Sequence, residues 1–135
     1  MPTPVKELEG ATDELVAKLA ERGIMDNEEL VRAAATPAQR KELAGFCGCE
    51  TSEILHLANR ADLARIRGIG GVYSDLLEIA GVDTVKELAK RRPDALYAKI
   101  TETNDRDKLT TKPPTQGMIQ EWVGQAKALK SSLTY

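Results

Sequence analysis

The sequence predicts an all-α protein in which two related helical units pack as one compact pseudo-symmetric domain. Apolar residues recur at helical spacing along nearly the whole chain, and no segment alternates as a β-strand does. Only five of the 135 residues are aromatic, so the core consists mainly of Leu, Ile, Val and Ala, as helical packing favours. Breaks, caps and apolar positions also recur at a constant offset, which indicates a tandem repeat of one unit.

The first unit, residues 1–62, has its first clear break at Gly10. Thr12 or Asp13 then caps a helix that ends at Gly23. A short polar side chain at the N-cap accepts from a free amide, and glycine ends a helix without strain.

Capping-box patterns mark the next two helix starts, because an N-cap oxygen and an N3 side chain satisfy each other's amides. Asp26 with Glu29 begins one helix. Thr36-Pro37-Ala38-Gln39 begins the next, with proline at N1, and this helix is expected to run to about Gly45. A long helix follows Cys47-Gly48-Cys49 and leads to the glycine turn, with Ile54, Leu57, Ala58 and Ala61 on its buried face.

The second unit, residues 63–135, contains the stretch LARIRGIGGVYSDLLEIAGVDTVKEL from Leu63 to Leu88. Two helices joined through Gly68-Ile69-Gly70 form a hairpin there. Helices are expected at about 72–80, 84–91, 94–102 and 116–130, with a polar, proline-ended loop at 103–114.

The two halves of the chain correspond position by position. At an offset of 58, Leu8, Gly10, Leu19, Gly23 and Leu30 correspond to Ile66, Gly68, Leu77, Gly81 and Leu88. The offset then becomes 65, where Ile54, Leu57 and Ala61 correspond to Ile119, Trp122 and Ala126, and the polar loop accounts for the added residues. Each unit alone presents too little apolar surface to be stable, so we expect the two to pack together.

Charge is distributed unevenly over the two halves. The net charge is −2, but residues 1–62 carry 7 basic and 12 acidic side chains and residues 63–135 carry 12 basic and 9 acidic ones. A surface that meets phosphate therefore belongs to the second half. The chain has two cysteines, no secretory signal and no apolar run long enough to span a membrane, so we expect a reduced, cytoplasmic setting without membrane contact.

The region from Ile66 to Leu77 resembles the helix-hairpin-helix motif of DNA repair, replication and transcription proteins. The continuation from Ile79 to Leu88 adds specificity to this resemblance. The paired arrangement over nearly the whole chain is similar to a family of small bacterial proteins of unassigned function built from two such units. The resemblance implies a fold and, through the second hairpin, contact with the nucleic-acid backbone without sequence preference.

A physical basis for that contact exists in the residues themselves. Glycines at 68 and 70 permit a sharp turn and a close approach of the backbone to a ligand. The amides of Gly70, Gly71 and Val72 begin a helix and point toward an anion, aided by the helix dipole. The expected nucleic-acid-binding residues are Arg65, Arg67, Gly68, Gly70, Gly71 and Val72.

This chain departs from the DNA-binding pattern at two places. Such motifs commonly carry proline and then Lys or Arg after the second glycine, whereas Gly71 and Val72 stand here, so one phosphate cation is missing. The first hairpin, Gly10-Ala11-Thr12-Asp13-Glu14, lacks the second glycine and places two acids where an anion would bind. The first copy is therefore expected to be structural. The alternative for Gly68-Ile69-Gly70 is likewise a tight turn with Ile69 in the core.

Catalysis, metals and cofactors find no support in the sequence. Cys47, Cys49 and His56 fall short of a four-ligand zinc set, and they are interpreted as structural or partly exposed. No nucleophile–base pair or phosphate loop accompanies the single histidine, so we expect no enzyme, no metal and no small-molecule substrate. Two hypotheses remain: a module that binds DNA through its backbone, or a protein-interaction adaptor in which both hairpins are structural.

Overall fold

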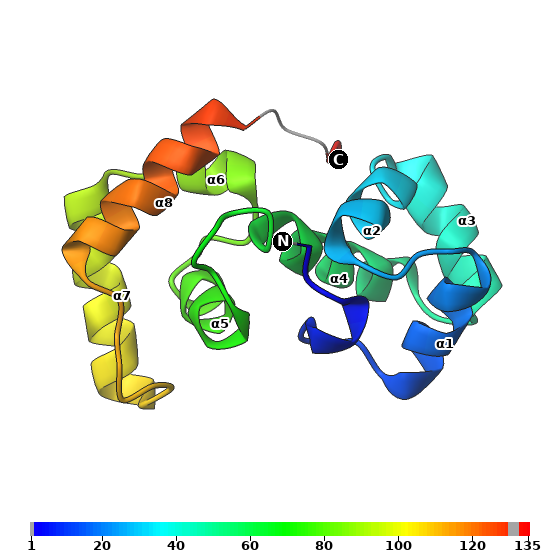
Figure 1. Ribbon diagram of the computed structural model, residues 1–135, viewed down its shortest axis with the longest axis horizontal. Helices are drawn as coiled ribbons and strands as arrows, with labels where there is room; N and C mark the ends of the chain where they lie inside the picture. The colour runs from blue at the N-terminus through cyan, green and yellow to red at the C-terminus, as the bar shows by residue number, and fades with distance from the viewer. Residues whose placement is uncertain (1, 130–132) are drawn as a thin grey trace. The chain divides into compact units, whose positions relative to one another are not determined.

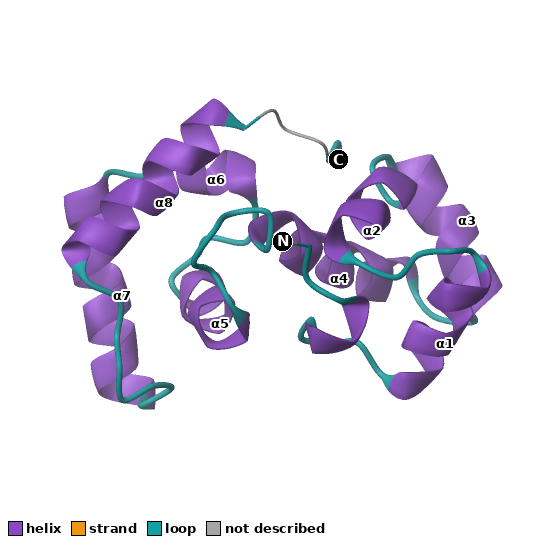
Figure 2. Ribbon diagram, in the orientation of Figure 1, coloured by secondary structure: helices purple, strands orange, loops and turns teal. Residues whose placement is uncertain are grey.

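The computed structural model describes residues 2–129 and 133–135. Within these ranges its regular elements are all helices (Figures 1 and 2). The prediction of an all-α fold is confirmed. The only β-type pairing in this part of the chain is an isolated antiparallel bridge between Pro4 and Asp26. Of the expected elements, the end of the last helix at 130 lies outside the described residues.

The chain divides into two compact units, which are described separately. The first comprises residues 1–65 and 131–135, and the second comprises residues 66–130. The described residues 133–135 belong to the first unit, and the division after residue 62 stays a prediction.

The first unit contains a short 3₁₀ helix and four α-helices. They are η1 (Val5–Glu7), α1 (Asp13–Glu21), α2 (Asn27–Ala33), α3 (Pro37–Cys47) and α4 (Thr51–Leu63). Helix α4 packs against α2 and α3, and α1 packs against α3. The core is formed by aliphatic side chains from all of these elements, among them Leu19, Leu30, Ile54 and Leu57, each without exposed surface.

Local sequence explains most helix starts in this unit. The Thr12 hydroxyl accepts from the Leu15 amide at 3.2 Å, so Thr12 is the N-cap of α1. The capping boxes at Asp26 and Thr36 are both formed as predicted. The end of α3 differs from the expectation: the helix passes Gly45 and ends at Cys47, and Gly48 is its C-cap with φ +70°. Burial of Cys47 against the core carries the helix through this last turn.

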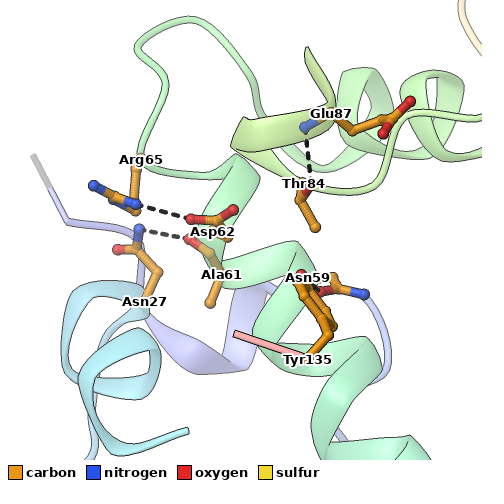
Figure 3. A network of polar contacts seen from close by, with 8 residues as sticks. All are labelled: Asn27, Asn59, Ala61, Asp62, Arg65, Thr84, Glu87 and Tyr135. Carbon is orange, nitrogen blue, oxygen red and sulfur yellow. Dashed lines mark hydrogen bonds and ion pairs between the residues drawn. The ribbon is translucent and has the colours of Figure 1, made fainter. Parts of the chain in front are cut away.

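Polar contacts complete the first unit (Figure 3). Asn27 is 1% exposed. Its side-chain Nδ2 donates to the Ala61 carbonyl at 3.1 Å, and its Oδ1 accepts from the backbone amide of Thr3. Residues 133–135 lie against the same unit: the Thr134 amide donates to the Ala35 carbonyl, and the Tyr135 hydroxyl donates to Asn59.

The second unit contains four α-helices, α5 (Gly71–Ile79), α6 (Val85–Ala89), α7 (Pro93–Asp107) and α8 (Gln116–Ala128). Helix α8 packs against α6 and α7, and α5 packs against α7. Its buried residues include Leu76, Leu77, Leu88, Ile100, Ile119 and Trp122. Thr84 caps α6 by accepting from the Glu87 amide at 3.1 Å (Figure 3).

Helix α7 is longer than the sequence suggested, because residues 103–107 were expected to be loop and are helical. Thr103 and Asn104 are polar but buried, at 1% and 7% exposure. The Thr103 hydroxyl donates to the Lys99 carbonyl of the preceding turn, and the Asn104 amide bonds the chain at Thr110. Burial of both side chains in the second unit favours the helical conformation of these two poor helix formers.

The bounds of two pairs of helices recur between the units at the offsets found in the sequence. Helices α1 and α5 begin and end 58 residues apart, and α4 and α8 begin and end 65 residues apart. The helix contacts also recur, since α2–α4, α3–α4 and α1–α3 in the first unit correspond to α6–α8, α7–α8 and α5–α7 in the second. The helix-hairpin-helix assignment itself stays a prediction.

Candidate functional site

The turn before α5 is a backbone break at Gly68. This residue has φ +97°, a conformation that L side chains rarely adopt. A Cβ placed on it would lie 2.9 Å from Nε1 of Trp122, on α8. Glycine is therefore required at 68 by both backbone conformation and packing.

A side-chain amide holds the residue before the break. The Arg67 N–H donates to Oε1 of Gln125 at 2.8 Å, and Nε2 of Gln125 donates back to the Arg67 carbonyl at 3.1 Å. Ile69 is 6% exposed, as expected for a residue in the core. The contribution of Gln125 could not be found from sequence, because no local pattern connects two residues 58 positions apart.

Gly70 and Gly71 differ from Gly68 because the fold does not require glycine at either. Gly70 has φ −98°, a conformation open to any residue, so the expected role of Gly70 in the sharp turn is wrong. A Cβ on Gly70 or Gly71 would meet no atom within 4 Å, and both residues are exposed. Gly45 and Gly124 have the same steric freedom but lie inside helices.

The start of α5 consequently carries accessible backbone amides. The first N–H groups of any α-helix have no partner within the helix. Gly70 is the N-cap and offers no side chain to accept from them. Val72, in the first turn, is 45% exposed.

The two predicted arginines have different environments. Arg65 belongs to the first unit, where its Nη1 lies 2.9 Å from Oδ1 of Asp62 (Figure 3). Its side chain is 16% exposed and that of Asp62 is 4% exposed, so the guanidinium neutralises a buried carboxylate. Arg67 is exposed, and the part of the chain that the structure describes places no hydrogen-bonding or ionic partner at its guanidinium. We therefore retain Arg67 and leave Arg65 out of the candidate site.

The corresponding helix start in the first unit is closed. Thr12, at the position that matches Gly70, caps α1 with its hydroxyl. Asp13 and Glu14 follow in the first turn and add negative charge. Gly10, which matches Gly68, has φ +92° and packs against the ring of His56 on α4. An anion has no comparable place there.

The two cysteines line a pocket of about 410 Å³ in the first unit, together with Glu14, Glu53 and His56 among others. Burial raises the pKa of the Cys47 thiol, and burial together with nearby negative charge raises the pKa of Cys49 to about 11. Both are then protonated at neutral pH, whereas nucleophilic and metal-binding cysteines react as thiolates. No cluster of three or more His, Cys, Asp or Glu side chains suited to a metal ion occurs within residues 2–129 and 133–135.

Residues 9–129 match the model of a protein family described as "Domain of unknown function (DUF4332)". Because the match covers most of the 135 residues, the chain belongs to this family. Searches of curated proteins and of solved structures found no match. Of the helices described, none has the combined length and apolar character of a membrane span.

Proposed function

We propose that this protein is a non-catalytic module that binds the phosphate backbone of nucleic acid, without sequence preference, through the start of α5. The observation that carries the proposal is the pair Gly70 and Gly71. Both are exposed glycines at an uncapped helix start, and neither is required by the fold. Because neither residue has a side chain, the backbone at both positions is open to a ligand that approaches closely.

Electrostatics support the same region. The helix dipole and the free amides of the first turn of α5 attract an anion. Arg67 adds a positive charge, and the Gln125 side chain holds the backbone of Arg67 in place. Contacts of this kind bind phosphate oxygens and position a protein on nucleic acid without distinguishing bases.

The expected affinity is modest, because only one of the two hairpins is open. Non-specific complexes typically have dissociation constants of about 10⁻⁴–10⁻⁶ M at physiological salt, and each phosphate contact adds to their salt dependence. A single arginine with a helix start belongs at the weak end of this range.

The proposal is tested by fluorescence-polarisation binding to short mixed-sequence duplex and single-stranded DNA over a series of salt concentrations. Wild type is expected to bind at low salt, and Arg67→Ala should reduce the slope of log K against log salt by about one phosphate contact. Gly70→Glu should abolish binding, because it places a carboxylate at the amides.

Gly124→Glu is the matched control. It makes the same substitution at another exposed glycine of the second unit, where a Cβ also meets nothing within 4 Å. If Gly124→Glu retains binding and circular dichroism shows intact helicity in all variants, the loss of binding in Gly70→Glu is due to the position of the new carboxylate and not to the change in net charge. Absence of wild-type binding even at low salt would refute the proposed function.

A second candidate is a protein-interaction adaptor, favoured by the exposed apolar side chains of α5. Val72 and Ile79 are 45% and 46% exposed. They are seven residues apart, so they share one face of the helix. A protein complex formed there should persist at high salt and be lost in a Val72→Asp, Ile79→Asp variant, which an affinity pull-down with salt washes measures.

A further inference from the structure

The polar loop between α7 and α8 is held in a defined conformation, although its composition suggested only a connection. The Asn104 side chain brackets Thr110 with two hydrogen bonds, from Nδ2 to the Thr110 carbonyl and from the Thr110 amide to Oδ1, both 3.0 Å long. The Lys112 amide donates to the Thr110 hydroxyl at 3.0 Å. Asn104 is 7% exposed, so the loop is attached to the packed end of α7.

A third attachment joins this loop to α5. The Tyr73 hydroxyl donates to the Lys112 carbonyl at 2.8 Å. Tyr73 is the third residue of α5, in the turn that begins at Gly71. Side chains of a helix lean toward its N-terminus, so the loop is bonded beside the uncapped start of α5.

The Tyr73 ring is itself fixed by the residue beneath the glycine turn. Its centroid lies 5.4 Å from that of Trp122, at an interplanar angle of 51°. The same indole lies against Gly68. Lys112, Tyr73, Trp122 and Gly68 therefore form one continuous series of contacts within the second unit.

Lys112 has an ammonium group available to a ligand. The residue is exposed, and the described part of the chain records no hydrogen bond or ion pair for its side chain. Its backbone, by contrast, is held on both sides, through its amide and its carbonyl. Arg67 shows the same combination of a fixed backbone and an unpaired cation.

We propose that the 108–115 loop is a second arm of the phosphate-binding surface, in which Lys112 supplies the cation that Val72 does not provide. This inference rests on the proposed function and concerns the same nucleic-acid backbone. Arg67 and Lys112 bind phosphate oxygens, and the α5 amides receive the phosphate that is closest to the glycines. Tyr73 acts as a positioning residue, because it holds the Lys112 backbone without contributing charge.

The test compares Lys112→Ala, Tyr73→Phe and their combination with wild type, using the same duplex and single-stranded DNA and the same salt series. Lys112→Ala should weaken binding about 3- to 10-fold at moderate salt and reduce the salt slope by about 0.7–0.9, which corresponds to one phosphate contact. Tyr73→Phe keeps the ring and the charge but removes the hydrogen bond that holds the Lys112 carbonyl to α5, so a 2- to 3-fold loss of affinity, on the order of one weakened contact, is expected. In the Lys112→Ala background Tyr73→Phe should have no further effect, since the cation that it positions is gone.

Lys127→Ala is the matched control for loss of one lysine charge. Lys127 is exposed on α8 and lies two residues after Gln125, about 200° around the helix from the side that bonds Arg67. It should leave the salt slope unchanged. A slope reduced by Arg67→Ala but not by Lys112→Ala would overturn this inference and leave the proposed function standing. Equal reduction by Lys112→Ala and Lys127→Ala would also overturn it, and no wild-type binding would remove both.

Discussion

The starts of α1 and α5 have the same backbone design and different chemistry. Each follows a glycine with strongly positive φ, +92° at Gly10 and +97° at Gly68, and each helix is nine residues long. Each glycine packs against a ring from the last helix of its own unit, His56 of α4 in the first and Trp122 of α8 in the second. The helix start is then closed by Thr12 in one unit and left open by Gly70 in the other.

This difference shows that the turn and the helix start perform separable tasks. Each turn combines a positive-φ glycine with a ring packed against it, whereas the residue two positions later decides whether the first amides of the helix are capped by a side chain. A glycine turn alone is therefore weak evidence for ligand binding. Under the proposed function, the residues at the N-cap and in the first turn distinguish the open helix start of α5 from the closed one of α1.

The largest difference between the units should appear when the two rings are removed. Trp122 is 2% exposed, and Trp122→Ala should lower the free energy of unfolding by about 3–5 kcal/mol through lost burial and the remaining cavity. The His56 side chain is 38% exposed, and His56→Ala should cost less than about 1 kcal/mol. Urea unfolding followed by circular dichroism measures both. Similar losses of stability in the two variants would contradict the expectation that the buried Trp122 contributes more than the partly exposed His56.

Alanine at the glycines should give the next largest effect and separate turn from helix start. Gly68→Ala and Gly10→Ala should each lower the free energy of unfolding by roughly 1–3 kcal/mol, because both positions have positive φ and a ring within contact distance. Gly71→Ala should be neutral or stabilising by up to about 1 kcal/mol, since helix propensity improves and the added Cβ meets nothing. Thermal unfolding compares the three, and marked destabilisation by Gly71→Ala would contradict the view that the fold does not require that glycine.

The smallest effect concerns acid stability of the first turn. Nε2 of His56 lies 2.7 Å from Oε2 of Glu9, and this contact, aided by the charge of Arg60, holds the pKa of Glu9 below its ordinary value despite partial burial. Because the pKa of Glu9 is lower in the folded state, the ionised carboxylate stabilises the protein at pH values above its ordinary pKa of about 4.5. This stabilisation is lost as pH falls through the lowered pKa. Glu9→Gln should therefore flatten the decline of stability in this acid range. Chemical unfolding at a series of pH values tests it, and an unchanged acid decline in Glu9→Gln would exclude a role for this pair.

Local patterns predicted the helix starts well, because capping depends on residues three positions apart. The boxes at Asp26 and Thr36 formed as expected. Helix ends were predicted less well. The chain continues as helix through Thr103 and Asn104 because both side chains are buried in the folded unit, and α3 continues past Gly45 because Cys47 is buried.

The sequence likewise identified only the part of the candidate site that is contiguous in the chain. The glycines, the helix that follows them and Arg67 are contiguous, so composition and spacing identified them. The binding partners of the arginines were not predictable. Asp62 is close to Arg65 in sequence, but its burial, and hence its need for a cation, is a property of the folded unit. Gln125, Tyr73 and Lys112 come together with the turn only through packing of α5, α7 and α8.

By itself the sequence determined that this chain is helical, where most helices begin, that its two halves correspond, and that only the second half carries net positive charge. These properties depend on side-chain periodicity, short-range hydrogen bonding and composition. Only the tertiary structure decided which glycines are required, which arginine is neutralised and which loop lies beside α5. Those outcomes depend on contacts between residues distant in the chain, where burial and steric fit select the partners.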